Sequence, residues 1–175
     1  MKKITAIFFL LIAIVTTAQE QQKLKQNLLL QADEMGKAFI AKDYAAFASF
    51  THPDLLKKFG GTQKMADIIR YSFSQIENVK FIDVTFAQPS EIINVEGELQ
   101  CTVPQMIEME ADGQQVTANT TIIAISRDNG KTWSFTDTAG QNIQALQATI
   151  PNLSPQLNIP EIQEPVFNEA PVKNR

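Results

Sequence analysis

The side chains best suited to nucleophilic or metal chemistry are scarce in this chain. It holds one histidine, His52, and one cysteine, Cys101, among 175 residues. A Ser-His-Asp or Cys-His arrangement would have to use His52, and the sequence has neither a Gly-x-Ser-x-Gly elbow nor a glycine-rich phosphate loop. Metal chemistry would have to rest on carboxylates. We therefore expect no metal site and no cofactor, and we expect Cys101 to be a buried, unreactive thiol because it alternates with Leu99 and Val103.

One segment has a specific local pattern. Ser126-Arg127-Asp128-Asn129-Gly130-Lys131-Thr132-Trp133 fits Ser-x-Asp-x-Gly-x-x-Trp and resembles the Asp box, a hairpin motif repeated in sialidases and related propellers. In such a turn the Asp carboxylate accepts backbone N–H groups, Gly supplies a positive φ and Trp covers the hairpin. A propeller needs several blades, and the sequence has one copy of the motif and no internal repeat. We expect a structural hairpin turn built by Ser126, Asp128, Gly130 and Trp133.

Charge excludes one class of partner. The chain has 15 Lys and Arg against 19 Asp and Glu, a net charge of −4, and no basic run that could neutralise phosphates. We therefore expect no nucleic-acid partner.

Residues 1–18 are typical of a signal peptide. Lys2 and Lys3 precede an apolar run that ends at Val15, and the small residues of Thr16-Thr17-Ala18 predict cleavage after Ala18. The run is shorter than the roughly 20 residues that a spanning helix needs. The sequence thus predicts export to a periplasm or to the exterior, without stable membrane insertion after cleavage.

Helical periodicity dominates the next part of the chain. Residues 19–42 form an expected long amphipathic helix, and Asp43 can cap a second, short helix that ends before His52-Pro53. Residues 54–59 look like a further helical turn ended by Gly60-Gly61, and Thr62 is the expected cap of a third helix. The expected buried stripe of that helix consists of Met65, Ile68, Ile69, Phe73 and Ile76.

After residue 78 the period changes to two, which indicates strands. Residues 80–87, 98–109, 114–127 and 132–137 form an expected antiparallel meander with turns at 111–113 and 128–131. Ile82, Val84 and Phe86 should share one face of the first strand, and Pro104 indicates an edge position or a bulge. A short helix from residue 141 should stop at Pro151.

The last 25 residues hold five of the eight prolines. Two interpretations of this tail remain open: a disordered or loosely draped segment, or an extended segment that docks on its own domain or on a partner. The expected organisation is a signal peptide (1–18), one domain (19–150) and a Pro-rich tail (151–175).

The order of these patterns predicts an α+β cone: three N-terminal helices on a curved antiparallel sheet of about four strands, then a short helix and the extended tail. Residues 19 to about 139 resemble the nuclear-transport-factor-2-like superfamily, which has a cystatin-like fold, and more narrowly small exported proteins of Bacteroidota. The matches are Ala38-Phe39-Ile40-Ala41-Lys42-Asp43-Tyr44, Thr51-His52-Pro53, Gly60-Gly61 with Met65, and Asp128-Asn129-Gly130-Lys131-Thr132-Trp133-Ser134-Phe135. The resemblance implies a cone whose open end holds a small apolar or amphipathic ligand, and a possible homodimer through the sheet.

Enzymes of that superfamily place carboxylates, Tyr or His inside the cone for proton transfer, because an apolar pocket raises a carboxyl pKa. The candidates in this chain are Tyr44, His52, Tyr71, Asp83 and Glu108. Strand alternation places Asp83 and Glu108 on the solvent face. Three functions therefore stay open: a noncatalytic exported domain that binds a small molecule or a partner through its cone or sheet, a proton-transfer or hydration enzyme, and an envelope interaction protein that acts through its tail.

Overall fold

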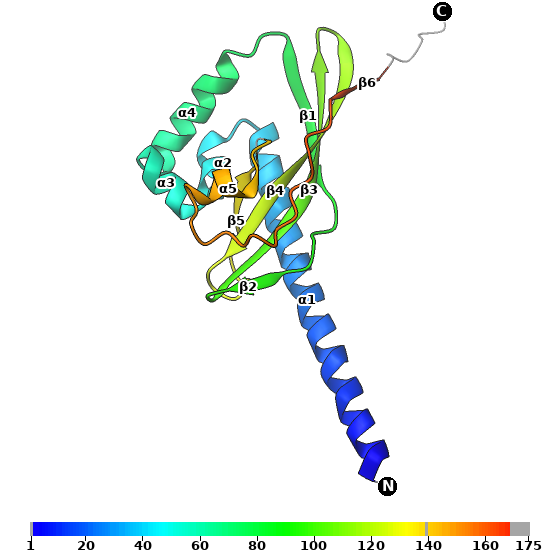
Figure 1. The fold of residues 1–175 in the computed structure, drawn as a ribbon. Coiled ribbons are helices and arrows are strands. Elements are labelled where there is room, and N and C mark those ends of the chain that lie inside the picture. Colours follow the sequence, from blue (N-terminus) through cyan, green and yellow to red (C-terminus); the bar gives the residue numbers. More distant parts are fainter. Residues whose placement is uncertain (1, 139, 169–175) are drawn as a thin grey trace, which may run out of the picture.

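The computed structural model describes residues 2–138 and 140–168, with the side chains of residues 2–18 and 168 excepted. Its elements are α1 (Lys2–Ile40), α2 (Tyr44–Ser49), α3 (Pro53–Phe59), α4 (Thr62–Ser74), β1 (Val79–Phe86), β2 (Ile93–Val95), β3 (Glu98–Ala111), β4 (Gln114–Ser126), β5 (Ser134–Asp137), α5 (Ile143–Gln147) and β6 (Val166–Asn168). The N-terminal helices pack on a strongly curled antiparallel sheet, and the first half of α1 projects away from the body of the domain (Figure 1). The predicted α+β fold class is confirmed.

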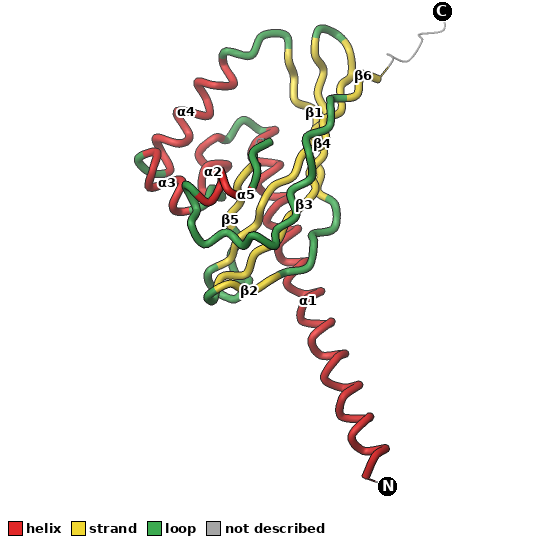
Figure 2. The backbone as a smooth tube through the Cα atoms, viewed as in Figure 1, coloured by secondary structure: helices red, strands yellow, loops and turns green. Residues whose placement is uncertain are grey.

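The sheet has the order β1-β3-β4-β5, with β2 paired to β3 and β6 paired to β4 (Figure 2). The four predicted strands are all present. Asp112 and Gly113 join β3 to β4 with positive φ angles of 50° and 79°, as the hairpin pattern predicts. Pro104 lies in β3, one residue before the part of that strand that pairs with β1. Its missing N–H therefore costs no hydrogen bond between these two strands.

Both faces of β4 are covered. On one face α1 buries Leu28 and Ala32 against Cys101 of β3 and Ala124 of β4. On the other face Ile123 and the residues around it pack against α5 and the tail. Alternate residues of one strand point to opposite faces, so β4 is the centre of two hydrophobic cores.

Cys101 is fully buried in the first core. Burial raises the pKa of its thiol to about 12. The expectation of a buried thiol is therefore confirmed, and its raised pKa favours the protonated, weakly nucleophilic form.

Strand β1 departs from the predicted alternation. A β-bulge interrupts its register with β3 between Phe81 and Asp83 and leaves Ile82 without a paired residue. Val84 is buried, whereas Ile82 is 41% exposed, so the prediction that the two share a covered face is wrong. The extra residue of a bulge interrupts the alternation of side chains between the two faces of the sheet, so residues before and after it no longer follow one pattern.

Helix α4 also departs from prediction. Gly61, not Thr62, is its N-cap, and it makes no side-chain capping bond. Ala66 is the only buried residue of the helix, while Ile68 and Ile76 of the expected buried stripe are 38% and 43% exposed. The helix packs on α2, which has six residues, and so short a helix cannot cover the whole stripe.

The described part of the tail docks on its own domain. Leu153 and Leu157 are buried in the second core. The side chain of Gln100, itself fully buried, donates to the carbonyl oxygen of Asn152 at 2.9 Å and accepts from the backbone N–H of Ser154 at 2.9 Å. Of the two interpretations left open by the sequence, self-docking is the one the structure shows. Residues 169–175 lie outside the described residues.

Among the residues whose side chains are described, no helix has the length and apolar character needed to cross a membrane.

Candidate functional site

The five predicted acid–base candidates do not come together. Tyr71 is 68% exposed on α4, and His52 is fully buried at the start of α3. Asp83 and Glu108 are exposed, as predicted, and lie directly opposite each other on β1 and β3. Only Tyr44 lines the largest apolar hollow described below.

His52 acts as a helix cap. Its Nδ1 accepts the backbone N–H of Asp54 at 3.3 Å, and its Nε2 is buried without a hydrogen-bond partner. Arg127 lies nearby and joins Glu98 and Asp54 through donor–acceptor distances of 2.6 and 3.1 Å. Burial, with the positive charge of Arg127, lowers the pKa of His52, although Asp54 and Glu98 oppose this shift. The imidazole is therefore a neutral structural group.

A His52→Asn variant should remove part of the acid sensitivity of the fold. Because the folded pKa of His52 lies below its unfolded value of about 6.5, its contribution to stability is present above that value. It is lost as the pH falls from there through the folded pKa. Asparagine keeps the cap and does not titrate. Thermal unfolding between about pH 7 and pH 5 should show a smaller loss of stability in the variant than in the parent chain; an equal loss would contradict this role.

The Asp-box segment is a closed turn between β4 and β5. The carboxylate of Asp128 accepts the backbone N–H groups of Lys131 and Thr132 at 3.1 and 2.9 Å, and these bonds, chiefly that of Thr132, lower its pKa. Ser126 Oγ donates to Asp128 at 2.9 Å and accepts the N–H of Gly130 at 2.8 Å. Helix α1 holds the turn from outside, and Trp133 is buried in the first core. The polar groups of Ser126 and Asp128 thus form hydrogen bonds within the fold.

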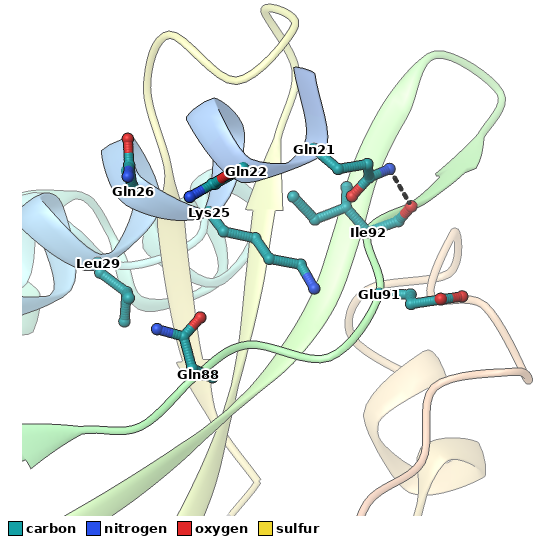
Figure 3. A pocket seen from close by; sticks show the side chains of 8 residues that line it. All are labelled: Gln21, Gln22, Lys25, Gln26, Leu29, Gln88, Glu91 and Ile92. Atoms are coloured by element: carbon teal, nitrogen blue, oxygen red, sulfur yellow. Dashed lines mark hydrogen bonds between the residues drawn. The ribbon is translucent and has the colours of Figure 1, made fainter. Parts of the chain in front are cut away.

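A polar hollow of about 510 Å³ lies between α1 and the loop that follows β1 (Figure 3). Four glutamines, Lys25 and Glu91 line it together with Leu29 and Ile92. Gln21 Nε2 donates to the carbonyl oxygen of Ile92 at 3.2 Å, and Lys25 extends between Gln88 and Glu91 (Figure 3). Six of its eight lining residues are polar or charged and none is aromatic, so it offers a ligand fewer apolar side chains than the groove described next.

A hollow of about 610 Å³, here called the aromatic groove, lies between the end of α1, the start of α2, α4 and β1. Its lining residues are Phe39, Ile40, Lys42, Tyr44, Phe73, Ile76, Val79, Lys80, Phe81 and Ile82. The rings of Phe39, Phe73 and Phe81 contact one another with centroid separations of 4.9 to 5.3 Å. Tyr44 stacks on Phe73 with a centroid separation of 6.2 Å and an interplanar angle of 4°.

A β-bulge of β1 lies beside this groove. The register shift falls between Phe81 and Asp83, so Ile82, which lines the groove next to Phe81, has no partner on β3. Ile82 and Ile76 are 41% and 43% exposed there. The result is an aromatic floor with two partly uncovered isoleucines beside it.

Sequence reasoning selected only Tyr44 from the groove, because Phe39, Phe73 and Phe81 fit ordinary core periodicity. A bulge leaves no clear signal in one sequence.

No protein-family model matches the chain, and neither the curated proteins nor the solved structures include a match. In the part of the chain that the structure describes, no three His, Cys, Asp or Glu residues are close enough to hold a metal ion.

Proposed function

We propose that this chain is an exported, noncatalytic domain of the nuclear-transport-factor-2-like type that binds a small apolar or amphipathic molecule in the aromatic groove. The export and family parts rest on the N-terminal segment and on the order of helices and strands along the sequence. The binding part rests on the groove.

The observation that carries the proposal is the aromatic floor of the groove, beside which Ile76 and Ile82 are partly uncovered. Exposed apolar surface is unfavourable by about 25 cal/mol per Å², and a ligand that covers Ile76 and Ile82 recovers this energy. The volume of about 610 Å³ is within the range of small-molecule sites, roughly 300 to 1,000 Å³. The aromatic floor is already packed by ring contacts, so little side-chain ordering is needed when a ligand binds.

The lining favours binding over catalysis. Proton transfer needs an acid or base within hydrogen-bond reach of the substrate. Of the five acid–base candidates only Tyr44 lines the groove, and none of its ten lining residues is a carboxylate or a histidine. His52, Asp83 and Glu108 lie outside the groove, so the groove supports binding without acid–base chemistry from them.

An Ile82→Asn variant should bind an uncharged apolar probe more weakly. We use dodecanol and expect one site per chain, with affinity about tenfold lower in the variant because the ligand loses an isoleucine contact. Isothermal titration calorimetry measures this change. Because Ile82 is already 41% exposed, the unfolding temperature should change little.

Leu30→Asn is the matched control. Leu30 is 64% exposed on α1 and is absent from the groove lining, so dodecanol affinity should stay the same. Lack of saturable binding to the parent chain would overturn the proposal, as would equal affinities of the parent chain and the Ile82→Asn variant.

A further inference from the structure

The geometry points to a more specific ligand class for the aromatic groove: a single-chain amphiphile with an anionic head, such as a long-chain carboxylate. This inference rests on the proposed function, because it assigns the head group of a molecule whose apolar part lies on the Phe39, Phe73 and Phe81 floor. The head group would contact Lys42 and Lys80.

All the charged side chains that line the groove are positive. Lys42 and Lys80 are the only charged residues among its ten lining residues, although the chain as a whole carries a net charge of −4. Both are exposed, and neither forms an ion pair within the described part of the chain. Two unpaired ammonium groups beside an apolar floor are complementary to an anionic amphiphile.

Carboxylates lie near both lysines, and Lys80 shares a second hollow with Glu110 and Asp112. Glu110 is opposite Lys80 in the β1–β3 register, but no ion pair joins them. Asp43 follows Lys42 in the chain, and its Oδ1 is occupied by the backbone N–H of Ala46 at 3.0 Å as the cap of α2. No ion pair within the described part of the chain holds either ammonium group, so each can turn toward a ligand head.

The backbone conformation determines where Lys42 lies. Lys42 has a φ of +58° at the junction of α1 and α2, a conformation that glycine or asparagine adopts more easily. The segment nonetheless carries a lysine there, beside the groove. This left-handed residue ends α1, with the N–H groups of Lys42 and Asp43 bonded to carbonyl oxygens of Phe39 and Ala38, so Lys42 is held at the junction beside the groove.

The geometry also limits the shape of the apolar part. Ile76 lies in the connection between α4 and β1, Ile82 lies in β1, and both contribute to the groove and stay partly exposed. Figure 1 shows the chain passing directly from α4 to β1 at this end of the molecule. A single alkyl chain can lie along the aromatic floor between these two side chains, with its head at the lysines.

Calorimetric titration of the full chain with three amphiphiles of equal chain length tests the inference. The probes are dodecanoate, dodecanol and dodecyltrimethylammonium, each below its micelle concentration. We expect dodecanoate to bind at least about tenfold more tightly than dodecanol, and the cationic probe to bind most weakly. The preference for dodecanoate should weaken as salt is added, because exposed charges are screened.

The double variant Lys42→Asn with Lys80→Gln should lose the preference for dodecanoate while its affinity for dodecanol stays within about twofold. Asparagine tolerates the positive φ at position 42, so the local fold is retained, which thermal unfolding verifies. Lys64→Gln, an exposed lysine of α4 outside the groove, is the control and should behave like the parent chain.

The outcomes separate the two claims. Equal binding of dodecanoate and dodecanol by the parent chain would overturn the anionic ligand class and leave the apolar site standing. A preference that survives in the folded double variant, or tighter binding of the cationic probe, would also overturn the ligand class. Absence of binding by every probe would overturn the ligand class together with the proposed function.

Discussion

Deletion of residues 151–175 is expected to leave a chain without a cooperative thermal unfolding transition. The deleted segment supplies Leu153 and Leu157, which are 2% and 7% exposed in the second core. Loss of each buried leucine costs about 2–5 kcal/mol. The deletion also removes the Ser154 N–H that pairs with Oε1 of the buried Gln100, at about 1–3 kcal/mol, and leaves its Nε2 with only the 3.4 Å contact to Glu98. These losses are comparable to the whole stability of an ordinary domain, about 5–15 kcal/mol.

A shorter deletion is the control. Removal of residues 160–175 keeps both leucines and the contacts of Gln100. It removes Ile162, Val166 and Phe167, which are each more than half exposed, so the unfolding temperature should fall only slightly. Circular dichroism during heating measures all three chains. An unchanged unfolding temperature after deletion of residues 151–175 would contradict the docked tail.

Gly130→Ala is expected to produce the second large loss of stability. Gly130 has a φ of +79°, where a side chain costs about 1–2 kcal/mol. A Cβ atom there would also overlap Cδ2 of Leu24 on α1. Cδ2 is the end of a partly buried side chain that can move aside, so relief of that overlap should add about 1 kcal/mol.

Gly113→Ala is a matched control with the same φ of +79° and no atom within 4 Å of the added Cβ. The backbone cost is common to both variants, so the difference in their free energies of unfolding, from urea titrations, isolates the contact between the Asp-box turn and α1. Equal losses in the two variants would show that α1 does not constrain the turn.

The strong sequence signals concern local structure. Asp43 caps α2, Gly60 ends α3 in the left-handed region, and Asp112-Gly113 closes a hairpin, each as predicted from residue type. Strand β2 was not predicted, although Glu96-Gly97, with φ angles of 51° and 88°, is a two-residue turn signal between Ile93–Val95 and β3. Its three residues are too few to establish a period.

The groove could not be predicted because it depends on tertiary events. The bulge at Ile82 is set by pairing between β1 and β3, and strict alternation gives the wrong face for this residue. The uncovered side of α4 depends on how α2 packs against it, and the amphipathic pattern of α4 alone predicts full burial. Proline content likewise could not show that Leu153 and Leu157 complete a core.

The most direct test of the proposed binding function is native mass spectrometry of the chain purified gently from its producing cell, compared with its denatured mass. We predict a small-molecule adduct that is lost on denaturation and that is reduced in the Ile82→Asn variant but not in Leu30→Asn. A bare polypeptide mass for the parent chain, or an adduct retained equally by the Ile82→Asn variant, would contradict a ligand site in the aromatic groove.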